Sequence, residues 1–175
     1  MDADEPSPEE SITAETADMV PKLIEQDLEQ HARKFVEIFA EGWHAPRSAD
    51  ELVKHFTPWL TNDFRFTQPF LRGEGVGHAQ FAERFARPLF AIMRNVHATV
   101  DSWANAGDTV FIALTVTCTL GRHRVVFRGC DRLRLVDGKA AERHNYADLS
   151  PVLIALLRSP GLWPRAIRLA PILYG

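Results

Sequence analysis

The first half of the chain carries apolar residues at the spacing of amphipathic helices. A first helix is predicted to begin near Pro21 and to end near Gly42. Its apolar stripe consists of Ile24, Leu28, Phe35, Phe39 and Trp43. A second, short helix follows a capping-box sequence at residues 48–51 and stops at Pro58. A third is predicted over His78–Met93, with a kink at Pro88.

From residue 95 onward the pattern changes to the alternation of strands. Strands are predicted at 95–104, 109–120, 123–136 and 140–149, after an earlier one at 63–68. The dipeptide Asp137-Gly138 is a strong hairpin signal, because such turns need a positive φ. Three helices followed by consecutive strands indicate an α+β fold, with helices packed on one face of a curved antiparallel sheet.

The two ends differ from this central domain, which we place at 19–150. Residues 1–18 are acidic, contain two prolines and have little to bury, so they are predicted to form a disordered tail. Residues 151–175 are apolar and carry three arginines. Contact with a membrane surface is one interpretation of such a segment. We favour packing over the sheet edge, as a lid or at a dimer interface.

Composition restricts the class of protein. The 175 residues, of which 46% are hydrophobic and 25% charged, are typical of one globular domain. A net charge of −3 argues against a nucleic-acid partner. Cys118 and Cys130 form neither a zinc pair nor a disulfide framework, and the histidines lack metal-ligand spacing. The acidic start is unlike a secretory signal. We therefore expect a cytoplasmic protein without metal or cofactor.

One acidic residue breaks the alternation of the strand at 123–136. Arg124, Arg128, Arg132 and Arg134 share one face, which must be solvated. The opposite face is apolar apart from Asp131. Moving the register by one residue would bury the arginines, so Asp131 is predicted to point into the core.

A buried Asp131 has two interpretations. A carboxylate among apolar neighbours pays a desolvation cost when ionised, so it could serve as a general acid or as a neutral donor to an oxyanion. Alternatively, backbone amides or an arginine satisfy it. The neighbouring strand has one fully apolar face, so any cavity should be apolar with few polar anchors. Val116, Cys118 and Phe127 are the expected ligand contacts on these strands, with Trp43 from the first helix.

The last strand supplies further candidates but leaves their direction open. His144, Tyr146 and Asp148 share one face, and Asn145 lies on the other. Both faces mix polar and apolar residues, so the pattern does not decide which one points inward. If the first set does, Asp148 could orient His144 or bind Tyr146 as part of a catalytic group. Otherwise these side chains join the sheet edge to the C-terminal segment.

Several segments together resemble a known family. They are Asp63-x-Arg-x-x-Gln-Pro69, Gly77-His78-Ala79 at the start of a helix, Asp131-Arg-Leu-x-x-x-Asp-Gly-Lys139, and Arg143-x-x-Tyr-x-Asp148. Over residues 22–150 the chain resembles the SnoaL-like branch of the NTF2-like superfamily, which includes polyketide cyclases, ketosteroid isomerases and limonene epoxide hydrolases. The resemblance implies a cone of curved sheet and helices around an apolar pocket, often in a homodimer.

The resemblance also assigns roles to individual residues. Asp131 matches the oxyanion-hole aspartate of the isomerases and the acid–base aspartate of the cyclases. Asp148 falls where epoxide hydrolases keep a carboxylate. Gln68 stands in place of the isomerase base, and Phe35 in place of its oxyanion-hole tyrosine. The strand over Ala113–Thr119 offers neither the Arg and Asp of the epoxide-hydrolase set nor the histidine of the cyclase, so none of the three activities transfers intact.

The sequence is compatible with three functions. The first is an enzyme in which Asp131, assisted by His144, Tyr146 or Asp148, isomerises, cyclises or dehydrates a small hydrophobic molecule. The second is a non-catalytic receptor for such a molecule, with Gln68 and Phe35 among its contacts. The third is an interaction protein that dimerises through the sheet and whose pocket is vestigial and filled by side chains.

Overall fold

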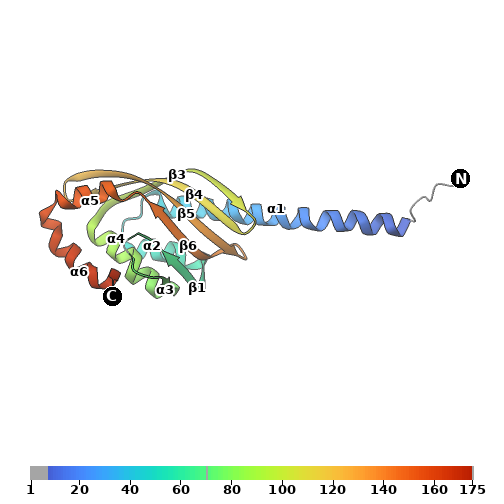
Figure 1. Cartoon of the computed structure of the whole chain (residues 1–175), viewed down its shortest axis with the longest axis horizontal. Helices are drawn as coiled ribbons and strands as arrows, with labels where there is room; N and C mark the ends of the chain where they lie inside the picture. The colour runs from blue at the N-terminus through green and yellow to red at the C-terminus, as the bar shows by residue number, and fades with distance from the viewer. Residues whose placement is uncertain (1–7, 70, 175) are drawn as a thin grey trace.

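Helix α1 is longer than the apolar stripe indicates. The computed structural model describes residues 8–69 and 71–174, so the tail prediction for residues 1–7 lies outside it. Helix α1 spans Pro8–His44, which corrects the prediction of disorder for residues 8–18. Glutamate and alanine are good helix formers, and a proline is tolerated in the first turn. Figure 1 shows this N-terminal part projecting away from the rest of the molecule.

The other predicted helices of the first half are present. Helix α2 spans Ala49–Phe56, and the Ser48 hydroxyl accepts a hydrogen bond from the Glu51 backbone N–H at 3.1 Å. The third predicted helix begins as α3 (Gly77–Gln80), widens into a π-helical segment (Phe81–Ala86) and ends as α4 (Arg87–Ile92). The widening lies directly before Pro88, which lacks the backbone N–H that a regular helix would use.

Six strands form one sheet in the order β2-β1-β6-β5-β4-β3. Their bounds are Leu60–Thr67 (β1), Gly75–Val76 (β2), Met93–Ala106 (β3), Thr109–Leu120 (β4), His123–Val136 (β5) and Lys139–Ala147 (β6). The predicted sheet was antiparallel throughout, but β1 pairs with β6 in parallel. Asp137 and Gly138 both have positive φ, which confirms the predicted turn between β5 and β6.

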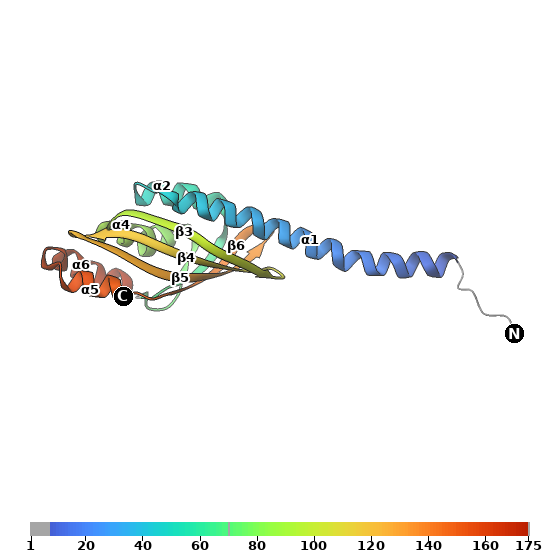
Figure 2. The same cartoon turned by 90° about the horizontal axis from the view of Figure 1, so that it is seen from above.

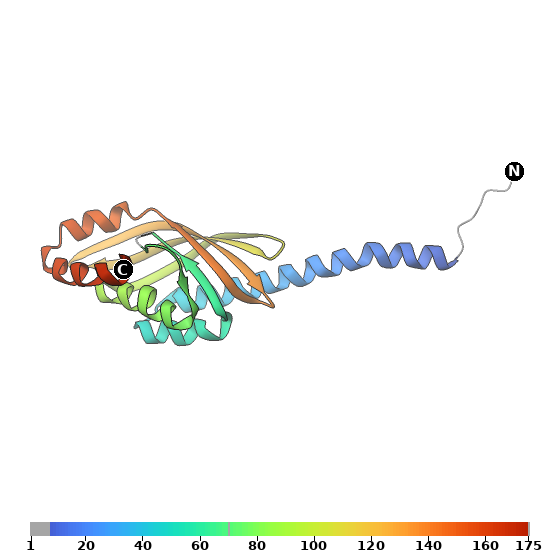
Figure 3. The ribbon, with the colours of Figure 1, turned by 60° about the horizontal axis from the view of Figure 1, so that its bottom comes forward.

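The helices enclose one face of the curved sheet. Figure 2 shows α1 and α2 in a layer along the sheet. The C-terminal segment forms α5 (Ser150–Leu157), a 3₁₀ turn (Pro160–Leu162) and α6 (Trp163–Tyr174). Figure 3 shows α5 and α6 beside α4, at the end of the molecule opposite the N-terminal part of α1. The core between these layers combines aromatic side chains of the helices and β1 with the apolar face of β4 and β5.

The outer face of the sheet is solvated and partly apolar. Phe111, Val126 and Tyr146 are exposed there, between threonines and arginines. Assembly of a homodimer through this face stays a prediction. Among the helices of the described residues, none combines the length and the hydrophobicity needed to cross a membrane.

Candidate functional site

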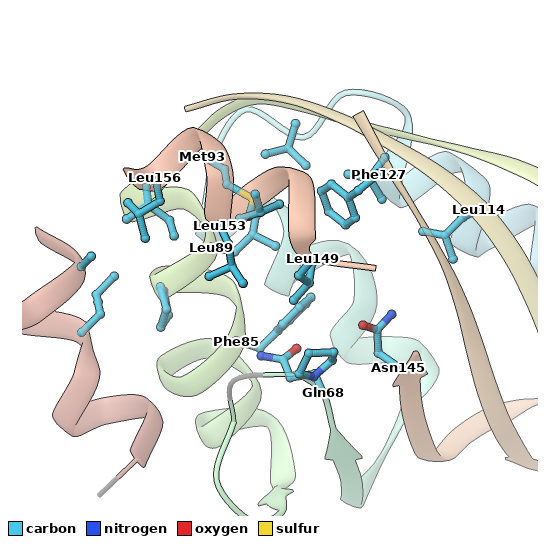
Figure 4. Close-up of a pocket in the computed structure, with 18 of the residues that line it drawn as sticks. Gln68, Phe85, Leu89, Met93, Leu114, Phe127, Asn145, Leu149, Leu153 and Leu156 are labelled. Carbon is cyan, nitrogen blue, oxygen red and sulfur yellow. The ribbon is translucent and has the colours of Figure 1, made fainter. Parts of the chain in front are cut away.

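A cavity of about 300 Å³ lies between the sheet and the helices at the C-terminal end of the fold (Figure 4). This volume is at the lower end of the range for pockets that bind small ligands. Side chains of α4, β4, β5, α5 and α6 form most of its wall. Its apolar lining includes Trp43, Phe85, Leu89, Met93, Leu114, Val116, Phe127, Leu149, Val152, Leu153, Leu156 and Leu169.

The polar groups of this cavity come from two strands and the end of a third. Asp131 on β5 is completely buried, and its Oδ1 lies 3.0 Å from Nη2 of Arg143 on β6. The Asn145 side chain donates a hydrogen bond to the same oxygen, from Nδ2 at 2.8 Å. The Arg143 guanidinium also lies 4.9 Å above the Phe85 ring, a cation–π contact. We refer to Asp131, Arg143 and Asn145 as the polar triad.

A β-bulge brings the triad together. A two-residue turn pairs Val136 with Lys139, and an uninterrupted ladder would then place His144 opposite Asp131. The register instead shifts by one residue beyond Leu135, so that Asp131 pairs with Asn145. Ala140 and Ala141 are consecutive and both buried, which is the burial pattern of a bulge. Beyond the bulge, each side chain of β6 lies on the face opposite to the one it would have in a regular ladder. Arg143 and Asn145 therefore point inward.

The triad is only partly satisfied. The ion pair and the hydrogen bond both involve Oδ1, and Oδ2 of Asp131 is buried without a hydrogen-bond partner in the described part of the chain. The same holds for Nη1 of Arg143. Because the two charges oppose each other at contact distance, the triad as a whole is electrically neutral. Asp131 is also the one member of the triad that could act as an acid or a base, because an arginine stays protonated in proteins and an amide does not titrate.

The predicted ligand contacts are divided between the cavity and the core. Trp43, Gln68, Val116 and Phe127 line the cavity. Phe35 and Cys118 do not, which corrects their placement. Phe35 borders a separate, smaller void beneath α1, and Cys118 belongs to the hydrophobic core. Burial raises the pKa of the Cys118 thiol to about 11, which makes it a poor nucleophile.

Asp131 lies at the cavity as predicted, but its three proposed assistants do not. The His144 ring contacts the Thr67 hydroxyl at 2.7 Å, and Tyr146 is 60% exposed. The exposed carboxylate of Asp148 accepts a hydrogen bond from the Ser150 backbone N–H at 3.0 Å, at the start of α5. Hydrogen bonds from Ser150 lower the pKa of Asp148. The bulge is the reason for this correction, because it turns these side chains away from Asp131.

Sequence reasoning missed Arg143 and Asn145 as site residues. Arg143 belonged to the motif that carried the family resemblance, but the pattern of the last strand did not show which face was buried. The C-terminal segment, which was expected to pack over the sheet edge as a lid or at a dimer interface, contributes Val152, Leu153, Leu156 and Leu169 to the cavity wall. No group of three or more histidine, cysteine, aspartate or glutamate side chains within residues 8–69 and 71–174 could hold a metal ion.

Comparison with known proteins agrees with this architecture. A putative SnoaL-like polyketide cyclase from Jannaschia sp. CCS1 superposes with a TM-score of 0.61 at 22% identity, over 75% of this chain and 94% of that one. An epoxide hydrolase of M. tuberculosis, described as LEH-like, gives 0.57 at 18% identity, over 78% and 97%. A hypothetical protein of ketosteroid isomerase-like fold from Catenulispora acidiphila, in complex with trimethylamine, gives 0.59 at 20%, over 69% and 90%.

At these identities the solved structures establish the fold, which is NTF2-like. No curated protein sequence matches the chain. The SnoaL-like domain family, however, matches residues 32–143, which include most of the sheet and two members of the triad. The chain therefore belongs to the SnoaL-like domain family.

Proposed function

We propose that the protein binds one small, uncharged and mainly apolar molecule in this cavity. The observation that carries the proposal is an apolar wall that ends at a buried and electrically neutral polar triad. An apolar ligand gains free energy by leaving water, at about 25 cal/mol for each Å² of surface that it buries. The few polar side chains then fix its orientation.

The ion pair argues that the ligand is neutral. Arg143 is the cationic residue of the cavity lining, and its charge is already opposed by Asp131 at 3.0 Å. An anionic ligand would approach the Asp131 carboxylate while losing its own hydration, and a cationic one would approach Arg143. Either desolvation would lack a compensating free charge. A neutral molecule avoids this cost.

A matched pair of fluorescent probes tests this proposal. N-phenyl-1-naphthylamine is uncharged, and 8-anilino-1-naphthalenesulfonate is the same framework with a sulfonate. We expect saturable binding of the neutral probe, and at least tenfold weaker binding of the sulfonate. Val116→Phe places a larger side chain in the cavity wall and should abolish binding of the neutral probe. A circular dichroism melt of this variant controls for folding.

Two results would contradict the proposal. One is the absence of saturable binding of the neutral probe to the wild type. The other is undiminished binding to a folded Val116→Phe variant, which would place the probe elsewhere on the molecule.

A second candidate function is general-base catalysis by Asp131. It is favoured by one observation, the buried Oδ2, for which residues 8–69 and 71–174 supply no hydrogen-bond partner. In this proposal Asp131, whose carboxylate lies 3.0 Å from the Arg143 guanidinium, acts as a base rather than as the acid expected from its burial alone. Because Asp131 has no exposed surface, a substrate reaches Oδ2 only after a neighbouring side chain moves.

The step can be written for a ketone. Oδ2 takes a proton from the carbon beside the carbonyl group, the C–H electron pair forms a C=C bond, and the carbonyl π pair moves to oxygen. The proton on Oδ2 exchanges with solvent, and return of a solvent-derived proton to the same carbon completes the exchange. In a β,γ-unsaturated ketone, return of the proton to the γ carbon of the dienolate completes an isomerisation. Incorporation of deuterium from D₂O into 2-tetralone, followed by proton NMR, measures the first step. General-base catalysis is worth about 10²–10⁴-fold. Equal exchange with wild type and with Asp131→Asn would exclude it.

A further inference from the structure

Two amide side chains lie side by side at the polar end of the cavity. Thr67 of β1 pairs with His144 of β6, and these two side chains contact each other on the outer face. Asn145, the next residue of β6, points to the opposite, inner face, and Gln68 directly follows the end of β1. Both line the cavity, and Figure 4 shows them facing the same space, close to Phe85 and Leu149.

The triad fixes which atom of Asn145 faces a ligand. Its Nδ2 donates to Oδ1 of Asp131 at 2.8 Å, and an ionised carboxylate accepts hydrogen bonds only. Rotation of the amide by 180° would bring Oδ1 against the carboxylate, two acceptors in contact. In Figure 4 the amide oxygen of Asn145 points toward the cavity and the nitrogen points away from it. The cavity therefore presents a fixed hydrogen-bond acceptor.

We propose that Asn145 Oδ1 determines ligand specificity by accepting a hydrogen bond from a hydroxyl or N–H group of the ligand. This inference rests on the proposed binding function and names its ligand class: neutral, mainly apolar molecules that carry a donor, such as phenols, alcohols and enols. Asp131 and Arg143 act as positioning residues, because they hold the amide in the accepting orientation. A ligand that carries only acceptors leaves Oδ1 without a partner in an apolar surrounding.

Gln68 differs from Asn145 in this respect. None of the hydrogen bonds described for the chain constrains its side-chain amide, so the amide can turn to present either its oxygen or its nitrogen. The Gln68 amide can form a hydrogen bond with either a donor or an acceptor on the ligand, so it should not discriminate between them. Gln68 is therefore the matched control for Asn145, an amide at the same end of the same cavity.

Two probes that share the naphthalene ring system test the proposed role of Asn145 Oδ1. 2-Naphthol carries a hydroxyl donor, whereas 2-methoxynaphthalene carries an acceptor alone. Equilibrium dialysis gives the dissociation constant of each, and the ratio of the two constants is the readout. For the wild type we expect 2-naphthol to bind about fivefold to tenfold tighter, the value of one hydrogen bond. Asn145→Leu should bring the ratio close to one by weakening 2-naphthol binding alone, and Gln68→Leu should leave the ratio unchanged.

A second variant separates positioning from direct contact. Asp131→Asn keeps the shape of the side chain but gives it a carbonyl and an amino group, so the Asn145 amide can flip. We expect the ratio to fall toward one while 2-methoxynaphthalene binds as before. Asn145→Ala substitutes for Asn145→Leu if the larger side chain prevents folding.

The outcomes separate the two proposals. Failure of both naphthalenes to bind the wild type would count against the binding function itself. Binding of both with a wild-type ratio near one, or with a ratio that survives in Asn145→Leu, would overturn the role of Asn145 and leave the binding function standing.

Discussion

Removal of one member of the buried ion pair should cost more stability than removal of both. Asp131 has no exposed surface, and the Arg143 side chain is 9% exposed. At the observed 3.0 Å and an effective dielectric constant of about 20, their attraction amounts to about 5–6 kcal/mol. Asp131→Leu leaves the guanidinium buried without a counter-charge, and Arg143→Met does the same to the carboxylate. Each single variant should lose about 3–5 kcal/mol of unfolding free energy.

The double variant Asp131→Leu/Arg143→Met contains no buried charge. Replacement of a buried ion pair by apolar side chains of similar volume is often neutral or stabilising. The amide of Asn145 still loses its acceptor, at a cost of about 1–3 kcal/mol. We therefore expect the double variant to be more stable than either single variant, with a coupling free energy of several kcal/mol.

Urea unfolding followed by tryptophan fluorescence provides the four free energies of this cycle. Equal m values across the variants would show that they unfold from comparable native states. The reasoning would be refuted by single variants that lose less than about 1 kcal/mol, or by a double variant whose loss equals that of the two singles combined. Either result would mean that water solvates the pair in solution.

Two further predictions concern residues outside the triad. In a Cys130→Ser background, Cys118 should react with Ellman's reagent at pH 8 only as fast as the protein unfolds, because burial raises its pKa to about 11; rapid labelling of native protein would contradict its place in the core. Asp148→Asn should be destabilising at pH 7, because hydrogen bonds from Ser150 lower the pKa of the carboxylate and so stabilise the fold above the unfolded-state pKa. This difference from wild type in urea unfolding should vanish as the pH falls through the lowered pKa, and a difference that persists there would point to another cause.

The sequence predicts the elements of the fold well where one physical signal dominates. In β5 the alternative register would bury four arginines, so the inward direction of Asp131 follows from the pattern alone and is confirmed by its complete burial. The apolar face of β4 and the turn at Asp137-Gly138 are predicted on equally strong grounds and are confirmed. The parallel pairing of β1 with β6 was not predicted, because strand partners distant in sequence leave no local signal.

The candidate site was predicted only in part for a different reason. Hairpin geometry alone would have placed His144 opposite Asp131, and only the bulge at the two buried alanines brings Asn145 there. Alanine fits buried and exposed positions of a strand alike, so its presence does not indicate a shift of register. A single extra residue thus decided which polar side chains meet at the cavity, and no pattern of hydrophobicity on that strand revealed it.

Several features that depart from ordinary packing rules occur together at the cavity. A buried carboxylate and a buried guanidinium meet at one end of it, and each has one buried polar atom that lacks a hydrogen-bond partner among the described residues. An ion pair in this position contributes little net stability compared with apolar side chains, so stability alone does not account for it. Where several local rules are broken at one place, function is a usual explanation. The binding measurements with donor and acceptor probes address that explanation directly, because Asn145→Leu removes the proposed acceptor while Asp131 and Arg143, which form the ion pair, stay in place.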